Sequence, residues 1–340
     1  MSSQPQPIPP QPTFPAWFAA LMNAPFVNAG ASVDGGILRV GDANRSDAQK
    51  QTSESFGFQW HKKSIFEKEE TSIQVRSWLS ERFGAPEDHI AEYGKDSVFL
   101  DAGCGASMSA MAYYGPANLA KVNYIGVDVS NAVDVAQQRF QDASLKNFMF
   151  VQSDLNSPVL NSETVDIIFS EGVLHHTDDA GKSFATLCRL LKPNGKFIFY
   201  IYKKKAPIRE FTDDYIRDAL MNLPPEEKYN KLFALTKLGK NLGDLNVEVN
   251  IEEPVEFLGI PAGKINLQRL FFYYMFKCFY RPDWTLDQMN LTNFDWYSPQ
   301  NCSRHTKEEV REWVAGVGGL SIEKEYEDDS GLSYIIRKKS

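Results

Sequence analysis

The chain has 340 residues, with a hydrophobic share of 43%, a charged share of 24% and a formal net charge of −8. This length allows one large domain with an insertion or two ordinary domains, and the composition is that of a globular protein. The acidic balance disfavours nucleic acid as a partner, because binding to phosphates requires a basic face.

The cysteines and the apolar segments exclude further classes of protein. No two of the four cysteines form a CxxC pair, so we expect neither a metal site nor a disulfide framework. The most apolar later stretch, residues 270–276, is far shorter than a membrane span, and Arg269 and Lys277 flank it. We therefore expect a cytoplasmic protein that contacts no membrane, and its oligomeric state stays open.

Residues 1–50 are predicted to form a Pro-rich tail followed by an irregular arm. The tail is Pro-rich as far as Pro15, and no basic segment precedes an apolar run, so we expect no secretory signal. An aromatic cluster follows at residues 56–60, Phe-Gly-Phe-Gln-Trp. It either fastens the arm to the core or forms a lid over a ligand. A helix is expected over residues 67–83, with Gly84 as its stop.

From residue 98, short apolar strands alternate with helical segments. The strands are expected over residues 98–101, 123–128, 148–151, 165–169 and 196–202, with a helix over 181–191. This alternation predicts an α/β fold, with a mostly parallel sheet that helices cover on both faces.

The alternation stops at residue 203 and resumes near residue 306. Residues 203–300 have the pattern of a mainly helical insertion. Thr306 and Glu309 then form a capping box that begins a helix, and residues 320–326 and 332–337 are expected to form a β-hairpin.

A glycine-rich turn follows the first predicted strand. In residues 101–107, Asp-Ala-Gly-Cys-Gly-Ala-Ser, Gly103 and Gly105 allow a tight turn and a close approach to a ligand. The N-terminus of the next helix offers N–H donors to a carboxylate. Such a turn can also merely link strand to helix. Asp101 would repel a phosphate, and Met108 stands where a dinucleotide fingerprint has its third glycine, so an amino-acid-bearing nucleoside is favoured.

Polar residues also end the next three predicted strands. They are Asp128, then Asp154 beside Leu155, then Ser170 with Glu171. Open α/β sheets bind ligands at the carboxyl ends of their strands, where a carboxylate can accept both hydroxyls of a ribose. The alternative is that each acid is a solvated loop residue.

These segments together resemble the class I S-adenosylmethionine-dependent methyltransferase superfamily. Residues 98–107 resemble its motif I, with Ser107 in place of the last glycine. Similar motifs of that superfamily are seen at residues 126–130, 153–155, 170–176 and 190–196. The resemblance implies a Rossmann-like core with a seven-stranded sheet, S-adenosylmethionine as the cofactor, and methyl transfer as the activity.

The resemblance also implies a role for each residue at the strand ends. Asp101 would lie near the amino group of the methionine part, Asp128 would hold the ribose, and Asp154 would accept from the adenine amino group. The backbone near Ser170 would face the sulfonium. The cofactor-binding residues that the resemblance implies are Asp101, Gly103, Cys104, Gly105, Asp128, Val129, Asp154, Leu155, Ser170 and Glu171.

Two adjacent histidines are the leading candidates for a catalytic base. An oxygen or nitrogen nucleophile often needs one, and histidine is the most common, so His175 and His176 are proposed for this role by their position. The alternative is that the pair only shapes the cofactor pocket. Glu171, His305 and Tyr297 are weaker candidates.

Four regions follow from this sequence analysis. We expect a tail and arm over residues 1–50, a lid with the Rossmann-like core over 51–202, an aromatic-rich substrate cap over 203–300, and a helix and hairpin that complete the core over 301–340. The aromatic residues of the cap serve either as core or as a substrate pocket. The lysines at 203–205 form either a solvated strand end or a site for an acidic substrate.

The predicted function is methyl transfer to a small-molecule acceptor, such as a metabolite, a natural product or a sugar. The acidic net charge and the aromatic insertion favour this function. The alternatives are a methyltransferase directed at RNA or protein, and a non-catalytic methyltransferase-like subunit.

Overall fold

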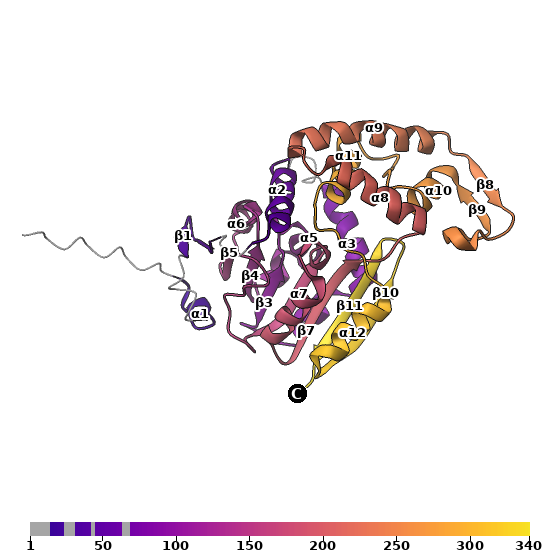
Figure 1. The fold of residues 1–340 in the computed structure, drawn as a ribbon. Helices are drawn as coiled ribbons and strands as arrows, with labels where there is room; N and C mark the ends of the chain where they lie inside the picture. The colour runs from indigo at the N-terminus through magenta and orange to yellow at the C-terminus, as the bar shows by residue number, and fades with distance from the viewer. Residues whose placement is uncertain (1–13, 24–30, 42–44, 63–68) are drawn as a thin grey trace, which may run out of the picture.

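The structure is a computed structural model that describes residues 14–23, 31–41, 45–62 and 69–340. Most of the predicted Pro-rich tail lies outside these residues. Within them, an α/β core holds one large sheet, and a group of helices from the later part of the chain lies beyond one end of that sheet (Figure 1). In these described ranges, no helix combines the length and the apolar character that crossing a membrane requires.

In the described part of the chain, the central sheet has nine strands in the order β1-β2-β5-β4-β3-β6-β7-β11-β10. All neighbours from β2 to β7 are parallel, whereas β11 pairs antiparallel with both β7 and β10. The predicted mostly parallel, Rossmann-like sheet is confirmed. The strands are β1 (Ser32–Asp34), β2 (Ile37–Arg39), β3 (Val98–Ala102), β4 (Asn123–Asp128), β5 (Phe148–Gln152), β6 (Val165–Glu171), β7 (Leu191–Tyr202), β10 (Leu320–Glu327) and β11 (Gly331–Lys338).

The number of strands differs from the expected seven. The seven expected strands are present, and β1 and β2 of the N-terminal arm extend the sheet beyond β5. Within the described residues, the arm is therefore more regular than expected. Strands of three residues are too short to show the alternation of apolar and polar residues by which a strand is recognised.

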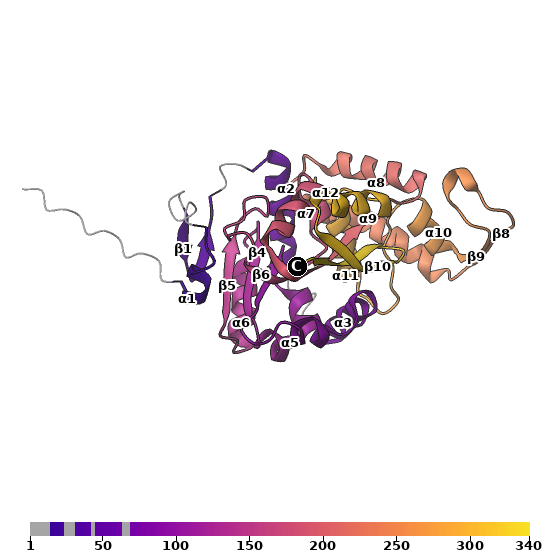
Figure 2. The ribbon, with the colours of Figure 1, turned by 90° about the horizontal axis from the view of Figure 1, so that it is seen from below.

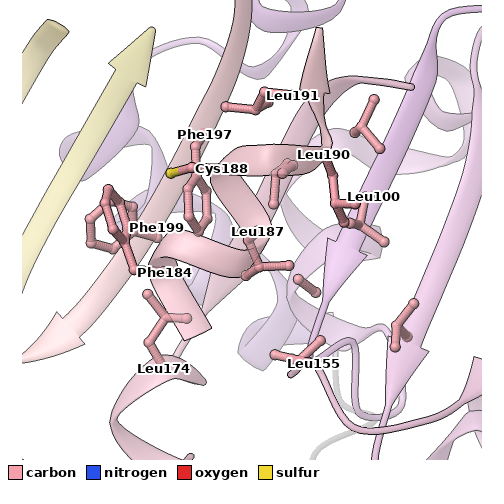
Figure 3. Packing of buried hydrophobic residues seen from close by; sticks show 14 of the residues in the cluster. Leu100, Leu155, Leu174, Phe184, Leu187, Cys188, Leu190, Leu191, Phe197 and Phe199 are labelled. Carbon is pink, nitrogen blue, oxygen red and sulfur yellow. The ribbon is translucent and has the colours of Figure 1, made fainter. Parts of the chain in front are cut away.

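Helices cover both faces of the sheet because successive strand residues point to opposite sides. Phe99 belongs to the apolar cluster on one face and Leu100 to the cluster on the other. Figure 3 shows Phe184 of α7 beside Phe197 and Phe199 of β7. The helices of the core are α3 (Glu69–Phe83), α4 (Pro86–Ala91), α5 (Met108–Leu119), α6 (Ala132–Asp142), the short η3 (Leu174–His176), α7 (Ala180–Leu190) and α12 (Lys307–Val317).

Between β7 and α12 the chain forms a separate group of helices with its own apolar cluster. Leu232 of α9 and Phe294 of α11 are buried there, and Phe58 of α2 (Asp47–His61) packs against Phe294. The helix α2 therefore joins this group to the core. The elements of the group are α8 (Pro207–Leu220), α9 (Pro225–Asp244), β8 (Glu248–Ile251), η4 (Glu256–Leu258), β9 (Gly263–Asn266), α10 (Leu267–Tyr274) and α11 (Leu286–Tyr297).

The N-terminal arm lies along the β5 edge of the sheet (Figure 2). Ile37 of β2 pairs with Phe150 of β5 in a parallel register, and Arg39 forms an ion pair of 2.6 Å with Asp134 of α6. Phe18, in the short helix α1 (Ala16–Ala19), is fully buried in the apolar cluster that also holds α7. The arm is thus part of the core.

Candidate cofactor and acceptor site

The carboxyl ends of β3, β4, β5 and β6 open into one cavity of about 700 Å³. Residues of α2 and α3 line one side of it, and residues of α8, α10 and α11 line another. This volume lies in the usual range for small-molecule sites. The cavity lies between the α/β core and the later group of helices.

Most residues predicted for the site lie together in this cavity. Two do not line it. Ser170 is fully buried behind the wall, where its hydroxyl donates to the carbonyl oxygen of Ala102 at 2.8 Å. His175 is also fully buried. The predicted residues that line the cavity are Asp101, Gly103, Cys104, Gly105, Asp128, Val129, Asp154, Leu155, Glu171 and His176.

The glycine-rich turn has the geometry that its sequence requires. Gly103 has a φ of +81°, and a Cβ atom there would lie 2.2 Å from Cγ1 of Val173. Ser107 has a φ of +54°, a left-handed conformation that glycine adopts more easily. Its hydroxyl lies 3.0 Å from the hydroxyl of Tyr124, which in turn donates to Asp101 at 2.5 Å. A buried hydrogen-bond chain thus accommodates serine at this position.

Carboxylates at the strand ends make this part of the cavity acidic. Asp128 accepts hydrogen bonds from the backbone N–H groups of Gly105 and Ser130, both at 2.8 Å. Burial raises the pKa of Asp101 to about 7, and it also raises the pKa values of Asp128 and Glu171. Neighbouring negative charge adds to the rise at Asp101. A ligand with positive charge and hydroxyl donors would therefore be stabilised here.

The two histidines differ in which ring nitrogen is free. Nδ1 of His176 lies 2.6 Å from the carbonyl oxygen of Asn301. A carbonyl can only accept, so Nδ1 carries the proton and Nε2 keeps a lone pair. In His175, Nδ1 accepts from the N–H of Tyr202 at 3.3 Å, so Nε2 carries the proton. Burial lowers the pKa of His176 to about 4, which keeps its ring neutral at neutral pH.

The aromatic cluster at residues 56–60 lies on α2, and its described side chains face two directions. The ring of Phe56 lines the cavity and meets the ring of His176 edge-on at 4.8 Å. The ring of Phe58 packs against Tyr229 and Phe294 instead. Phe58 therefore fastens the helix, while Phe56 forms part of the cavity wall.

Sequence reasoning missed several residues of the cavity wall. Arg82 of α3 pairs with Asp328 at 3.1 Å, and its guanidinium carbon lies 4.3 Å from the centre of the Tyr200 ring. The hydroxyl of Tyr202 donates to Asp295 of α11 at 3.1 Å. The sequence does contain a signal for Tyr200 and Tyr202, because residues two positions apart in a strand lie on the same face of it, here of β7.

Five of the aromatic residues in the later group of helices line the cavity. They are Phe272, Tyr273, Phe279, Trp284 and Trp296. Two weaker candidates for catalysis lie outside it. Tyr297 is fully buried and donates to Asp213 at 2.6 Å, and Nδ1 of His305 lies 3.3 Å from Glu309.

The lysines at 203–205 have different surroundings. Lys203 pairs with Glu327 at 3.1 Å and Lys204 with Glu309 at 2.9 Å, and neither lines the cavity. Lys205 does line it, although its ammonium donates to the backbone carbonyl oxygens of Asp329 and Ser330 at 3.1 and 2.6 Å. Three further basic residues of the cavity wall are Arg209, Arg269 and Lys277.

Comparison with known proteins places the core of the chain in a family. Residues 100–199 match the family model described as a methyltransferase domain. YcgJ of Bacillus subtilis, an uncharacterized methyltransferase, is 28% identical over 183 residues, which cover 51% of this chain and 70% of that protein. A highly reducing polyketide synthase of Pyrenophora dematioidea is 37% identical over 105 residues, which cover 29% of this chain and only 4% of the synthase.

Similar solved structures include the magnesium protoporphyrin IX methyltransferase of Synechocystis PCC 6803 with bound S-adenosylmethionine. It is 12% identical, with a TM-score of 0.46, over 87% of this chain and 99% of that chain. The family match begins within β3, contains the glycine turn and all elements from α5 to α7, and ends within β7. The core of this chain is a methyltransferase domain.

Proposed function

We propose that the protein transfers a methyl group from S-adenosylmethionine to a small-molecule acceptor. The observation that carries this proposal is a single cavity with two unlike ends. Where the strands end, the carboxylates of Asp101, Asp128 and Asp154 line it. On the side of the later helices it is lined by aromatic rings and basic side chains, with Asp295 among them. An acceptor bound among the rings would thus share the cavity with the cofactor.

The acidic end fits the cofactor by the chemistry of its groups. S-adenosylmethionine offers hydrogen-bond donors at its ammonium, its ribose hydroxyls and its adenine amino group, and carboxylates are acceptors. We assign the ammonium to Asp101, the ribose to Asp128 and the adenine amino group to Asp154. The apolar side chains of Val129 and Leu155, which also line the cavity, would contact the adenine ring.

The residues of the chain contribute mainly position and a proton acceptor. The bound cofactor supplies an electrophilic methyl group on its sulfonium. Aromatic walls exclude water and hold the acceptor in line, and such positioning can provide much of the rate enhancement. We propose that Nε2 of His176 takes the proton of the acceptor nucleophile, because its lone pair is left free by the bond to Asn301. His175 supports the site by stacking on Tyr202 at 3.6 Å.

A small-molecule acceptor is favoured over RNA. The net charge of −8 disfavours a polyanionic partner, and aromatic rings with a few placed polar groups are typical of small-molecule pockets. The similarity of part of the chain to polyketide synthases agrees with this choice.

The experiment that tests the proposed cofactor site is calorimetry with S-adenosylhomocysteine on the Asp128→Asn variant. Asparagine can still accept from the N–H of Gly105, so the turn is retained, but the charged acceptor for the ribose is lost. We expect the dissociation constant to rise about tenfold or more, since a hydrogen bond to a charged group contributes about 1.5–3 kcal/mol.

The matched control for this experiment is Asp142→Asn, the same change at an exposed residue near the end of α6. It should leave the dissociation constant unchanged. Equal affinities for wild type and Asp128→Asn would show that Asp128 is not a cofactor ligand. An absence of binding by the folded wild type would overturn the proposed function as a whole.

A further inference from the structure

Three cations gather around one indole ring at the end of the cavity away from the glycine turn. The ammonium of Lys277 lies 4.9 Å from the centre of a Trp296 ring, the guanidinium carbon of Arg209 lies 5.3 Å from it, and the ammonium of Lys205 lies 5.8 Å from it. No two of these charged centres are therefore more than about 11 Å apart. All three side chains line the cavity.

The carboxylate of Asp213 lies within this group, and both of its oxygens already have partners. Asp213 pairs with Arg209 at 3.1 Å, and it also accepts from the indole N–H of Trp296 at 2.8 Å and from the hydroxyl of Tyr297 at 2.6 Å. The backbone N–H of Lys277 donates to the same carboxylate at 2.9 Å. Asp213 thus balances the charge of Arg209 and fixes the ring around which the cations lie.

The other nearby acids have partners of their own. Asp295 accepts from the hydroxyl of Tyr202 at 3.1 Å, Asp328 pairs with Arg82 at 3.1 Å, and Asp329 interacts with the hydroxyl of Tyr273.

The two lysines are left without a paired carboxylate. Lys277 is 8% exposed, and its ammonium forms no ion pair with any carboxylate among the described residues. The ammonium of Lys205 is bonded to backbone carbonyl oxygens only, within the same part of the chain. Burial is the main cause that lowers the pKa values of both lysines. Arg209 lowers both further, whereas Asp295 raises the pKa of Lys277 and Asp328 raises that of Lys205. Neither ammonium is therefore in direct contact with a carboxylate, and an anion that reached both would stabilise their charged forms.

We propose that the acceptor carries an anionic group, a carboxylate or a phosphate, which binds between Lys277 and Lys205 beside Trp296. This inference rests on the proposed function and names the class of its substrate. The charged group is held at the basic end, and the apolar body lies against the aromatic rings that line the cavity. The nucleophilic atom of the acceptor is thereby directed toward the acidic end and the methyl donor.

The test compares two probes of the same shape, benzoate and benzamide, which differ in charge. Their dissociation constants are measured by ligand-observed NMR, on protein saturated with S-adenosylhomocysteine and on protein without it. We expect benzoate to bind at least about tenfold more tightly than benzamide, because a hydrogen bond to a charged group is the stronger one. Inorganic phosphate should compete with benzoate.

Substitutions of the two lysines test whether benzoate binds beside them. Lys277→Gln should abolish the preference for benzoate, and Lys277→Arg should retain it. Lys205→Gln should weaken the preference for benzoate, and this variant tests the proposal independently if Lys277→Gln does not fold. Lys231→Gln is the matched control, since Lys231 is an exposed lysine of α9 that pairs with Glu227 at 3.7 Å. It should change nothing.

Each contrary result overturns the proposal in a distinct way. Equal binding of benzoate and benzamide, or no binding of benzoate, shows that no anion site exists. An unchanged preference in Lys277→Gln and Lys205→Gln places the anion elsewhere. Loss of benzoate binding when S-adenosylhomocysteine is added shows that the cations serve the carboxylate of the cofactor. If S-adenosylhomocysteine itself fails to bind, the proposed function fails, while the measurement without it still decides on the anion site.

Discussion

The residues at the strand ends were the part of the site that the sequence predicted best. Asp101, Asp128 and Asp154 each end a short apolar strand, and parallel strands bring such ends to one edge. Sequence reasoning could not separate the roles of His175 and His176, because adjacent residues have equal claims by position. Their difference depends on partners far along the chain, above all the carbonyl oxygen of Asn301, 125 residues beyond His176.

His176→Gln tests the proposed base. We expect the rate of methyl transfer to fall about 10²–10⁴-fold, the usual contribution of a general base, while the affinity for S-adenosylhomocysteine stays near that of wild type. The control is His89→Gln, since His89 is also buried with a pKa lowered to about 4, but it does not line the cavity. It should leave the rate unchanged.

The pH dependence of the same rate follows from the pKa of His176. Burial lowers this pKa from 6.5 to about 4, so the ring stays neutral and able to accept a proton as the pH falls through 6.5. With the cofactor site kept saturated, so that titration of Asp101 near pH 7 does not limit binding, we expect a rate that is flat from pH 8 to about 5 and falls only as the pH approaches 4. A decrease centred near pH 6.5 in single-turnover measurements would contradict this environment for His176.

At the scale of elements, the sequence predicted the strands and helices whose apolar residues follow a clear pattern, but it did not predict the others. The strands from β3 to β7 showed as mostly apolar runs of four to seven residues, and the capping box at Thr306 marks the start of α12. In the segment between β7 and α12, the sequence shows many aromatic residues but not which of them face the cavity. That choice depends on how α8, α10 and α11 pack together, which is a long-range property.

Neighbouring tyrosines of α10 test the role of this segment. Tyr273 lines the cavity and Tyr274 does not, although both are half-buried in the same helix turn. Tyr273→Ala should raise the KM for an acceptor found by screening about tenfold, because an apolar contact surface is lost, without changing the affinity for S-adenosylhomocysteine. Tyr274→Ala should change neither constant. If Tyr273→Ala weakens only cofactor binding, the segment is a cofactor lid.

At the scale of the whole molecule, the sheet is extended by segments distant in sequence. The pairing of Ile37 with Phe150 and the burial of Phe18 join the N-terminal arm to the core. The sequence indicates the mostly parallel core, because each apolar strand is followed by a helix. It does not indicate which strand the arm joins, since the choice depends on which edge of the finished sheet is open.

Phe18→Ala tests how much the arm contributes to stability. Phe18 is fully buried, so its truncation should lower the free energy of unfolding by about 3–5 kcal/mol, measured by chemical denaturation. Phe257→Ala is the control, because that ring is 93% exposed, and its effect should stay within about 0.5 kcal/mol. Equal stability of the two variants would mean that the arm is not docked in solution.

The outermost strands of the sheet also affect how the protein behaves at high concentration. An open edge offers backbone groups to a strand of another molecule, which is a common start of fibrillar aggregation. At one edge, β1 offers only three residues. At the other, β10 is longer but carries four charged side chains in eight residues, Glu323, Lys324, Glu325 and Glu327. Strand-by-strand growth of one molecule onto another is therefore disfavoured at both ends, by length at one and by charge at the other.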